Sequence, residues 1–125
     1  MEAYKDSANV WTIGYGHTKD VTDGMKITQE EAEELFEADI KIYYNCVILN
    51  VGSICTNNQV AALTSFTFNL GVANFEKSTL LKVVKKNPSD FKTIRKEFVR
   101  WVYAGDKVVN GLKLRRSAEA DIYCS

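Results

Sequence analysis

The segment that most constrains the fold is residues 3–18, AYKDSANVWTIGYGHT. A glycine stands on each side of Tyr15, and glycine allows tight turns, positive φ angles and close approach of the backbone to another surface. Asn9 stands where a turn would need a left-handed residue, a conformation that asparagine tolerates better than most residues. The residues after Asn9 have β-strand character. The segment therefore predicts a β-hairpin that presents the Asp6 carboxylate and the Thr12 hydroxyl.

The remainder of the chain has the pattern of helices. Apolar residues recur at helical spacing from about residue 29 to residue 49, and Thr28 with Glu31 forms a capping box at the start of this helix. A second helix starts at Thr56 and ends at Gly71, and it is apolar on nearly every face, as buried helices are. Further helices are expected over residues 80–86, 90–102 and 112–123, and a loop or small hairpin over residues 105–111. This pattern predicts a mainly α protein with a small β part, an α+β arrangement.

The composition narrows the classes of function. The 125 residues suffice for one domain, and sixteen basic residues balance sixteen acidic ones, so no global charge favours nucleic acid or an anionic membrane. No apolar run approaches the roughly 18 residues that span a bilayer. The three cysteines have no C-x-x-C spacing, which favours free thiols in a reducing compartment. His17 is the sole histidine and has no neighbouring cysteine, so neither a metal site nor a cofactor is expected.

Four stretches together resemble a known family. The hairpin segment, ITQEEAEELFEAD, TNNQVAALTSFTFNLGVANFEKSTLLK and RWVYAGDKVVNGLKLRRSAEADIY follow in the order found in bacteriophage-type lysozymes, the endolysins of glycoside hydrolase family 24. The resemblance covers nearly the whole chain. It implies a single lysozyme-like domain with two lobes, in which a small hairpin lobe (1–28) is joined by a long helix (29–50) to a helical lobe (51–125).

The resemblance also implies a reaction and roles for three residues. The reaction is hydrolysis of the peptidoglycan glycan strand between N-acetylmuramic acid and N-acetylglucosamine. It needs an acid for the leaving oxygen and a carboxylate that activates water or stabilises the developing cation. Asp6 matches that second carboxylate and Thr12 matches a residue that orients the water. His17 matches a structural histidine that pairs with a carboxylate.

Three further positions match the family's sugar cleft, namely Asn69, Gly71 and Phe75. An amide and an aromatic ring suit the recognition of N-acetylated sugars. The alternatives are a capping role for the Asn69 amide and a core position for the Phe75 ring, and the sequence leaves both open.

The family's general acid is a glutamate in the pattern E-G-x-x-L-x-A-Y-x-D. Met1 falls on the leucine of this pattern and Asp6 on its aspartate, so the glutamate would precede Met1. We therefore expect an N-terminally truncated domain with impaired catalysis. One alternative is an active muramidase whose acid comes from Glu2 or from another segment. The other is a non-catalytic phage protein that binds a host protein or a second copy through the groove left by the first helix.

The expected location follows from the same features. As written, the chain shows neither a signal peptide nor a membrane anchor, which predicts the host cytoplasm, or the periplasmic cell wall if the protein is exported.

Overall fold

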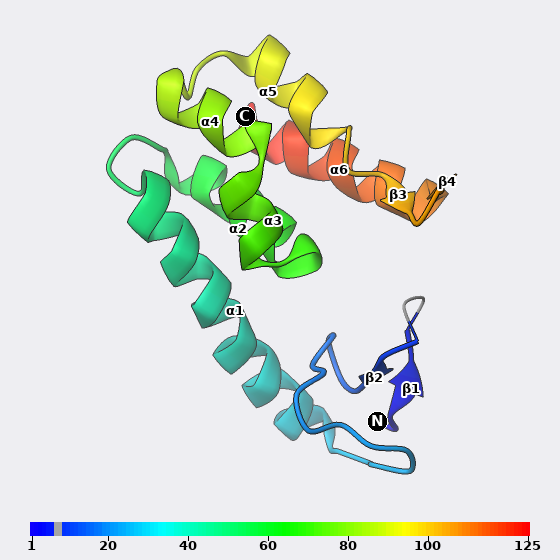
Figure 1. The fold of residues 1–125 in the computed structure, drawn as a ribbon. Helices are drawn as coiled ribbons and strands as arrows, with labels where there is room; N and C mark the ends of the chain where they lie inside the picture. Colours follow the sequence, from blue (N-terminus) through cyan, green and yellow to red (C-terminus); the bar gives the residue numbers. More distant parts are fainter. Residues whose placement is uncertain (7–8) are drawn as a thin grey trace. The chain divides into compact units, whose positions relative to one another are not determined.

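The computed structural model describes residues 1–6 and 9–125 (Figure 1). They form two compact units, Met1–Ile42 and Tyr43–Ser125. The boundary between the units falls inside helix α1 (Gln29–Val51), the helix that was expected to connect two lobes. Among the described residues, no helix is both long enough and apolar enough to cross a membrane.

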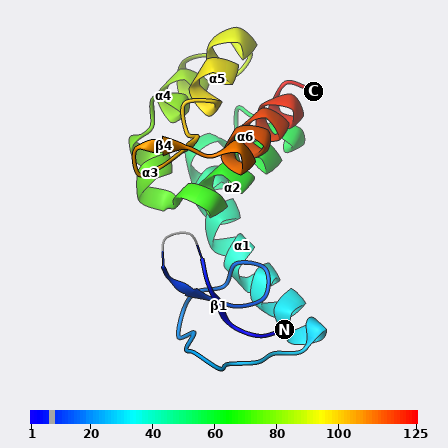
Figure 2. The same cartoon turned by 90° about the vertical axis from the view of Figure 1, so that its right-hand side faces the viewer.

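The first unit is built on a short antiparallel hairpin, β1 (Tyr4–Lys5) and β2 (Trp11–Thr12), in which Tyr4 lies opposite Thr12. The chain after β2 folds back beside the N-terminal part of α1 (Figure 2). A small core holds this unit together, because apolar side chains from the loops pack against the first turns of α1. Its buried members are Ile13, Val21, Ile27 and Ala32.

Helix α1 begins at the predicted capping box. The Glu31 N–H donates to the Thr28 hydroxyl at 3.1 Å, and the Thr28 N–H donates to the Glu31 carboxylate at 3.2 Å. These two bonds satisfy backbone donors that the helix itself leaves without partners.

The second unit is a cluster of helices around α2 (Asn57–Leu70). Helix α6 lies alongside α2 and the other helices complete the cluster (Figures 1 and 2). The ring of Phe66 on α2 makes edge contacts with Phe75, Phe98 and Trp101, at centroid distances of 6.3, 5.7 and 5.7 Å. The elements after α2 are α3 (Val72–Lys77), α4 (Thr79–Lys86), α5 (Phe91–Phe98), β3 (Tyr103–Ala104), β4 (Lys107–Val108) and α6 (Asn110–Tyr123).

The fold is mainly α with a small β-hairpin in the first unit, as the sequence predicts, and β3 pairs with β4 as a second short hairpin. Two details differ. Helix α3 was not predicted, because six residues are too few for a periodic pattern. Helix α5 ends at Phe98 and not near residue 102. There the chain turns, Val102 is buried, and its carbonyl accepts a hydrogen bond from the Val109 N–H at 2.9 Å. Burial and pairing of Val102 thus end the helix early.

Candidate active site

The first candidate residue, Asp6, follows β1 and is held to the hairpin by its own backbone and side chain. Its N–H donates to the Val10 carbonyl at 3.0 Å, and its carbonyl accepts from the Asn9 N–H at 3.0 Å. The side-chain oxygen Oδ1 accepts from the Val10 N–H at 2.9 Å. Asn9 has a φ of 67°, the left-handed conformation that the sequence predicts there. The turn thus fixes the Asp6 carboxylate relative to β2.

The second candidate, Thr12, lies on β2 and is only 3% exposed. Its hydroxyl donates to the Val10 carbonyl at 3.0 Å. A hydroxyl has one proton and two lone pairs, so Thr12 can still accept a hydrogen bond from a water molecule. Because the Val10 N–H binds Asp6 and the Val10 carbonyl binds Thr12, one residue anchors both candidate catalytic side chains.

His17 closes the next turn and has a carboxylate neighbour. Backbone bonds of 2.8 and 3.0 Å join it to Ile13, and Nδ1 lies 2.8 Å from Oδ2 of Asp39 on α1. Gly14 in this turn has a φ of 64°, and a Cβ there would lie 3.2 Å from the Ala32 side chain. The turn therefore lies so close to α1 that a larger residue would have to displace neighbouring side chains, in addition to adopting a positive φ. The carboxylate that the resemblance implies for His17 is present, and its structural role stays a prediction.

Glu2, the alternative acid, is exposed, and its backbone pairs with Lys26. A general acid works best when burial and neighbouring groups favour its protonated form at neutral pH. The exposed surroundings of Glu2 therefore give no support to its role as the general acid.

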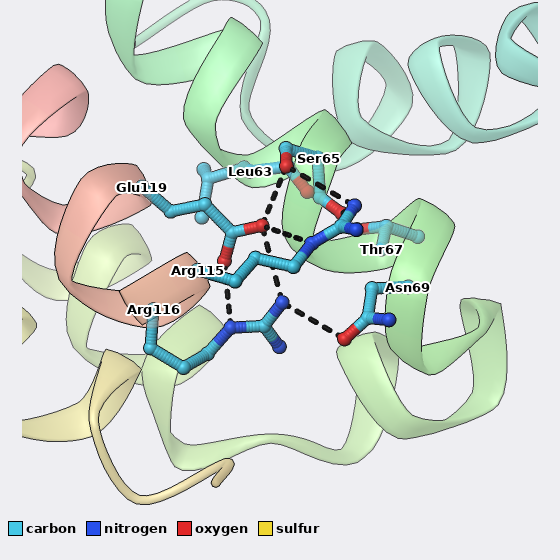
Figure 3. Close-up of polar contacts among 7 residues, drawn as sticks. All are labelled: Leu63, Ser65, Thr67, Asn69, Arg115, Arg116 and Glu119. Atoms are coloured by element: carbon cyan, nitrogen blue, oxygen red, sulfur yellow. Dashed lines mark hydrogen bonds and ion pairs between the residues drawn. The ribbon is translucent and has the colours of Figure 1, made fainter. Parts of the chain in front are cut away.

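In the second unit, Asn69 lies near the C-terminal end of α2, and its side-chain oxygen accepts a hydrogen bond from Arg116 Nη2 at 2.9 Å. Arg116 is completely buried and pairs through Nε with the Glu119 carboxylate at 2.8 Å. Arg115 and Ser65 contact the same carboxylate (Figure 3). Burial lowers the pKa of the Arg116 guanidinium, and the Glu119 charge opposes this shift.

No sequence pattern predicted this cluster around Asn69. The available signal was the spacing of Arg116 and Glu119, which places both side chains on one face of a helix.

Gly71 and Phe75 follow Asn69 along the chain. Gly71 separates α2 from α3 with φ 94° and ψ 155°, a conformation reserved for glycine. Phe75 is 0% exposed and belongs to the core of the second unit. Since a ring without exposed surface cannot stack on a sugar, the prediction that Phe75 binds substrate is corrected, and the core alternative applies.

The second unit has a cavity of about 440 Å³, and its lining includes Leu70, the residue that follows Asn69 in the chain. Its lining combines both charges, hydroxyl groups and two aromatic rings, which is a lining suited to a polar ligand with apolar faces. The lining residues are Leu70, Lys77, Ser78, Thr79, Glu97, Arg100, Trp101 and Tyr103. In the part of the chain that the structure describes, no group of His, Cys, Asp or Glu side chains is placed to hold a metal ion.

Comparison with known proteins decides the family. The model of the phage lysozyme family matches residues 1–119. The chain belongs to the phage lysozyme family. Among the relatives of this lysozyme domain is an endolysin of Acyrthosiphon pisum secondary endosymbiont phage 1, which is 37% identical over 98% of this chain and 86% of its own length.

Solved structures agree with this assignment. The endolysin from Escherichia coli O157:H7 phage FAHEc1 is 38% identical, with a TM-score of 0.83, over 98% of this chain and 81% of its own. The muramidase domain of SpmX from Asticaccaulis excentricus is 29% identical, with a TM-score of 0.88, over 99% of this chain and 86% of its own. The domain is therefore of the endolysin and muramidase type.

Proposed function

We propose that this lysozyme domain hydrolyses the glycan strand of peptidoglycan between N-acetylmuramic acid and N-acetylglucosamine. The observation that carries the proposal is the arrangement around Val10, whose N–H and carbonyl hold Asp6 and Thr12 on one short hairpin. Family membership supports the substrate, since the relatives are endolysins and a muramidase domain.

The proposed roles follow from the chemistry of glycoside hydrolysis. The Asp6 carboxylate activates the water or stabilises the positive charge that develops on the sugar. Thr12 has its proton directed to the Val10 carbonyl, so its oxygen accepts a hydrogen bond from the attacking water and orients that water. In the family pattern the general acid is a glutamate ahead of Met1. The experiment therefore includes a chain extended by that part of the pattern.

Within the second unit, two residues are proposed to contact a sugar. Asn69 presents an amide, and Gly71 bends the chain next to it without a side chain. We assign these two residues to the recognition of an N-acetylated sugar; Leu70, which stands between them in the chain, lines the cavity. His17 is assigned to holding the hairpin on α1 through Asp39.

The test is a peptidoglycan-clearing assay in which new reducing ends are counted. It uses the chain as written, the extended chain, and Asp6→Asn and Thr12→Val in whichever form clears. Asp23→Asn, an exposed loop aspartate, is the matched control. We expect both site variants to lose clearing at least tenfold and the control to keep it. Absence of clearing in both chains, or full clearing by Asp6→Asn, would refute the proposal.

Binding of a protein partner or a second copy is the alternative function. The structural feature that bears on it is the set of apolar side chains that α1 exposes in the second unit, Leu49 at 87% exposed above all. Contiguous apolar surface often marks an interaction site. The molar mass in solution tests the alternative, because a monomer that copurifies with no partner would exclude it. The family assignment favours the glycan function.

A further inference from the structure

The contact between Arg116 and Asn69 determines which way the Asn69 amide faces. A guanidinium has only donors, so it binds the oxygen of an amide and never the nitrogen. The contact at 2.9 Å is therefore made by Oδ1, and Nδ2 points away from Arg116 (Figure 3). Asn69 is exposed, and this nitrogen donates no hydrogen bond to the residues that the structure describes.

Arg116 is a fixed anchor because its own position is determined on several sides. Nη2 donates a hydrogen bond to Glu119 Oε2 at 3.2 Å, and Nε lies 2.8 Å from Oε1 as an ion pair, so contacts to both carboxylate oxygens restrict the guanidinium. The guanidinium carbon lies 5.1 Å from the centre of the Phe66 ring. Because the Arg116 guanidinium is held in this way and cannot reorient, the Asn69 amide adopts the orientation in which its oxygen faces Arg116.

The Glu119 carboxylate is itself held from α2. The Ser65 hydroxyl donates to Oε2 at 2.5 Å, and Arg115 Nε lies 3.3 Å from the same oxygen. Ser65 and Asn69 are four residues apart on α2, so they lie on one face of that helix. The cluster therefore ties α6 to the α2 face that carries Asn69.

We infer that Arg116 is a positioning residue that makes Asn69 a hydrogen-bond donor toward the ligand. Asn69 then recognises the carbonyl oxygen of an N-acetyl group and disfavours a de-N-acetylated sugar, which offers an ammonium group instead. This inference rests on the proposed glycan function and adds the atom of the sugar that Asn69 recognises. The same orientation would be lost if residue 116 could no longer donate.

The sharpest variant is Asn69→Asp, which keeps an oxygen for Arg116 and replaces the outward donor by an acceptor. The matched control is Asn45→Asp, the same chemical change at an exposed position on α1. Arg116→Met releases the amide, and Arg116→Lys keeps a donor. Because truncation of a buried residue can prevent folding, each variant is first compared by thermal unfolding, and Asn69→Asp is expected to be at least as stable as the unchanged chain.

Binding is measured by cosedimentation with purified peptidoglycan sacculi, native or enzymatically de-N-acetylated, in an Asp6→Asn background that prevents their degradation. The unchanged site is expected to bind native sacculi about tenfold more tightly than de-N-acetylated ones, the scale of one hydrogen bond to an uncharged group. Asn69→Asp is expected to reverse this preference, because a carboxylate attracts the ammonium. Arg116→Met should reduce the preference to about twofold, and Arg116→Lys should restore part of it.

An unchanged preference in folded Asn69→Asp would overturn the inference, and so would an equal loss in Asn45→Asp. Hydrolysis plays no part in this readout. Binding with the expected preference, together with sacculi that neither the chain as written nor the extended chain clears, would refute the proposed function and leave the inference standing. Clearing of sacculi together with equal binding of native and de-N-acetylated sacculi would refute the inference and leave the proposed function standing.

Discussion

Glu119→Leu is the change that tests the buried ion pair of the second unit most directly. Arg116 is 0% exposed and Glu119 is 2% exposed. The leucine would leave the guanidinium buried with one remaining bond, to Asn69. It would also remove the carboxylate that Arg115 and Ser65 contact, but these two side chains are partly exposed and can bind water instead.

The expected cost comes mainly from the charge that loses its partner. Breaking a buried ion pair from one side costs about 3–5 kcal/mol, which is a large share of the roughly 5–15 kcal/mol that stabilises a typical domain. Replacing both partners by apolar residues of similar volume is often neutral. The double variant Arg116→Met/Glu119→Leu is therefore expected to lie within about 1 kcal/mol of the unchanged protein.

The assay is urea unfolding followed by tryptophan fluorescence, with the free energy of unfolding taken by linear extrapolation. Trp11 lies in the first unit, whereas Trp101 packs against Phe66 in the second. A Trp11→Phe background therefore makes the signal report the second unit. Far-UV circular dichroism checks that the helices unfold in the same transition.

The decisive comparison is between Glu119→Leu and the double variant. Arg116→Met, added to Glu119→Leu, could lower the free energy of unfolding further instead of restoring it. The cost of Glu119→Leu would then arise from missing attraction or packing and not from an unpaired charge. That result would refute the reasoning. It would also remove the ground for treating Arg116 as a rigid anchor of Asn69.

Three further substitutions test the core position of Phe75, the backbone conformation at Gly71 and the dependence of stability on the ionisation of Tyr123. Phe75→Ala should lower the free energy of unfolding by about 3–5 kcal/mol, because the ring is fully buried, and folded protein should still bind sacculi. Gly71→Ala should cost about 1–3 kcal/mol in urea unfolding from its φ of 94° alone, because a Cβ there meets no atom within 4 Å. Burial raises the pKa of Tyr123, so stability should fall as the pH rises above about 10, where the unfolded chain ionises and the folded one does not. Tyr123→Phe should flatten that fall in urea titrations at pH 9 to 11, whereas exposed Tyr44→Phe should leave it unchanged.

Features that depend on neighbours in sequence could be predicted. The capping box at Thr28 needs only a hydroxyl and a carboxyl three residues apart, and Asn9 adopts the left-handed conformation for a local reason. The lengths of α1 and α2 follow from apolar spacing. The order of four motifs was enough to indicate the family that the comparisons show.

Features that depend on partners distant in sequence could not be predicted. Phe75 suits a cleft or a core equally well by residue type, and only its contact with Phe66 assigns it to the core. Asp39 is one of several acids on α1 until the turn at Gly14 brings His17 to it. Arg116 reads as one of two adjacent basic residues on a helix.

The sequence by itself thus determined the order and the local conformation of the elements, because caps, turns and amphipathic faces are set within a few residues. Only the tertiary structure decided which partners the side chains of the candidate site contact. The packing of α6 on α2 buries Arg116 against Phe66 and brings its donors to Asn69, 47 positions away in the chain. Most buried donors in proteins are hydrogen-bonded, and the Arg116 Nη2 donor takes the Asn69 oxygen as an acceptor. That contact orients the amide that we propose meets the sugar.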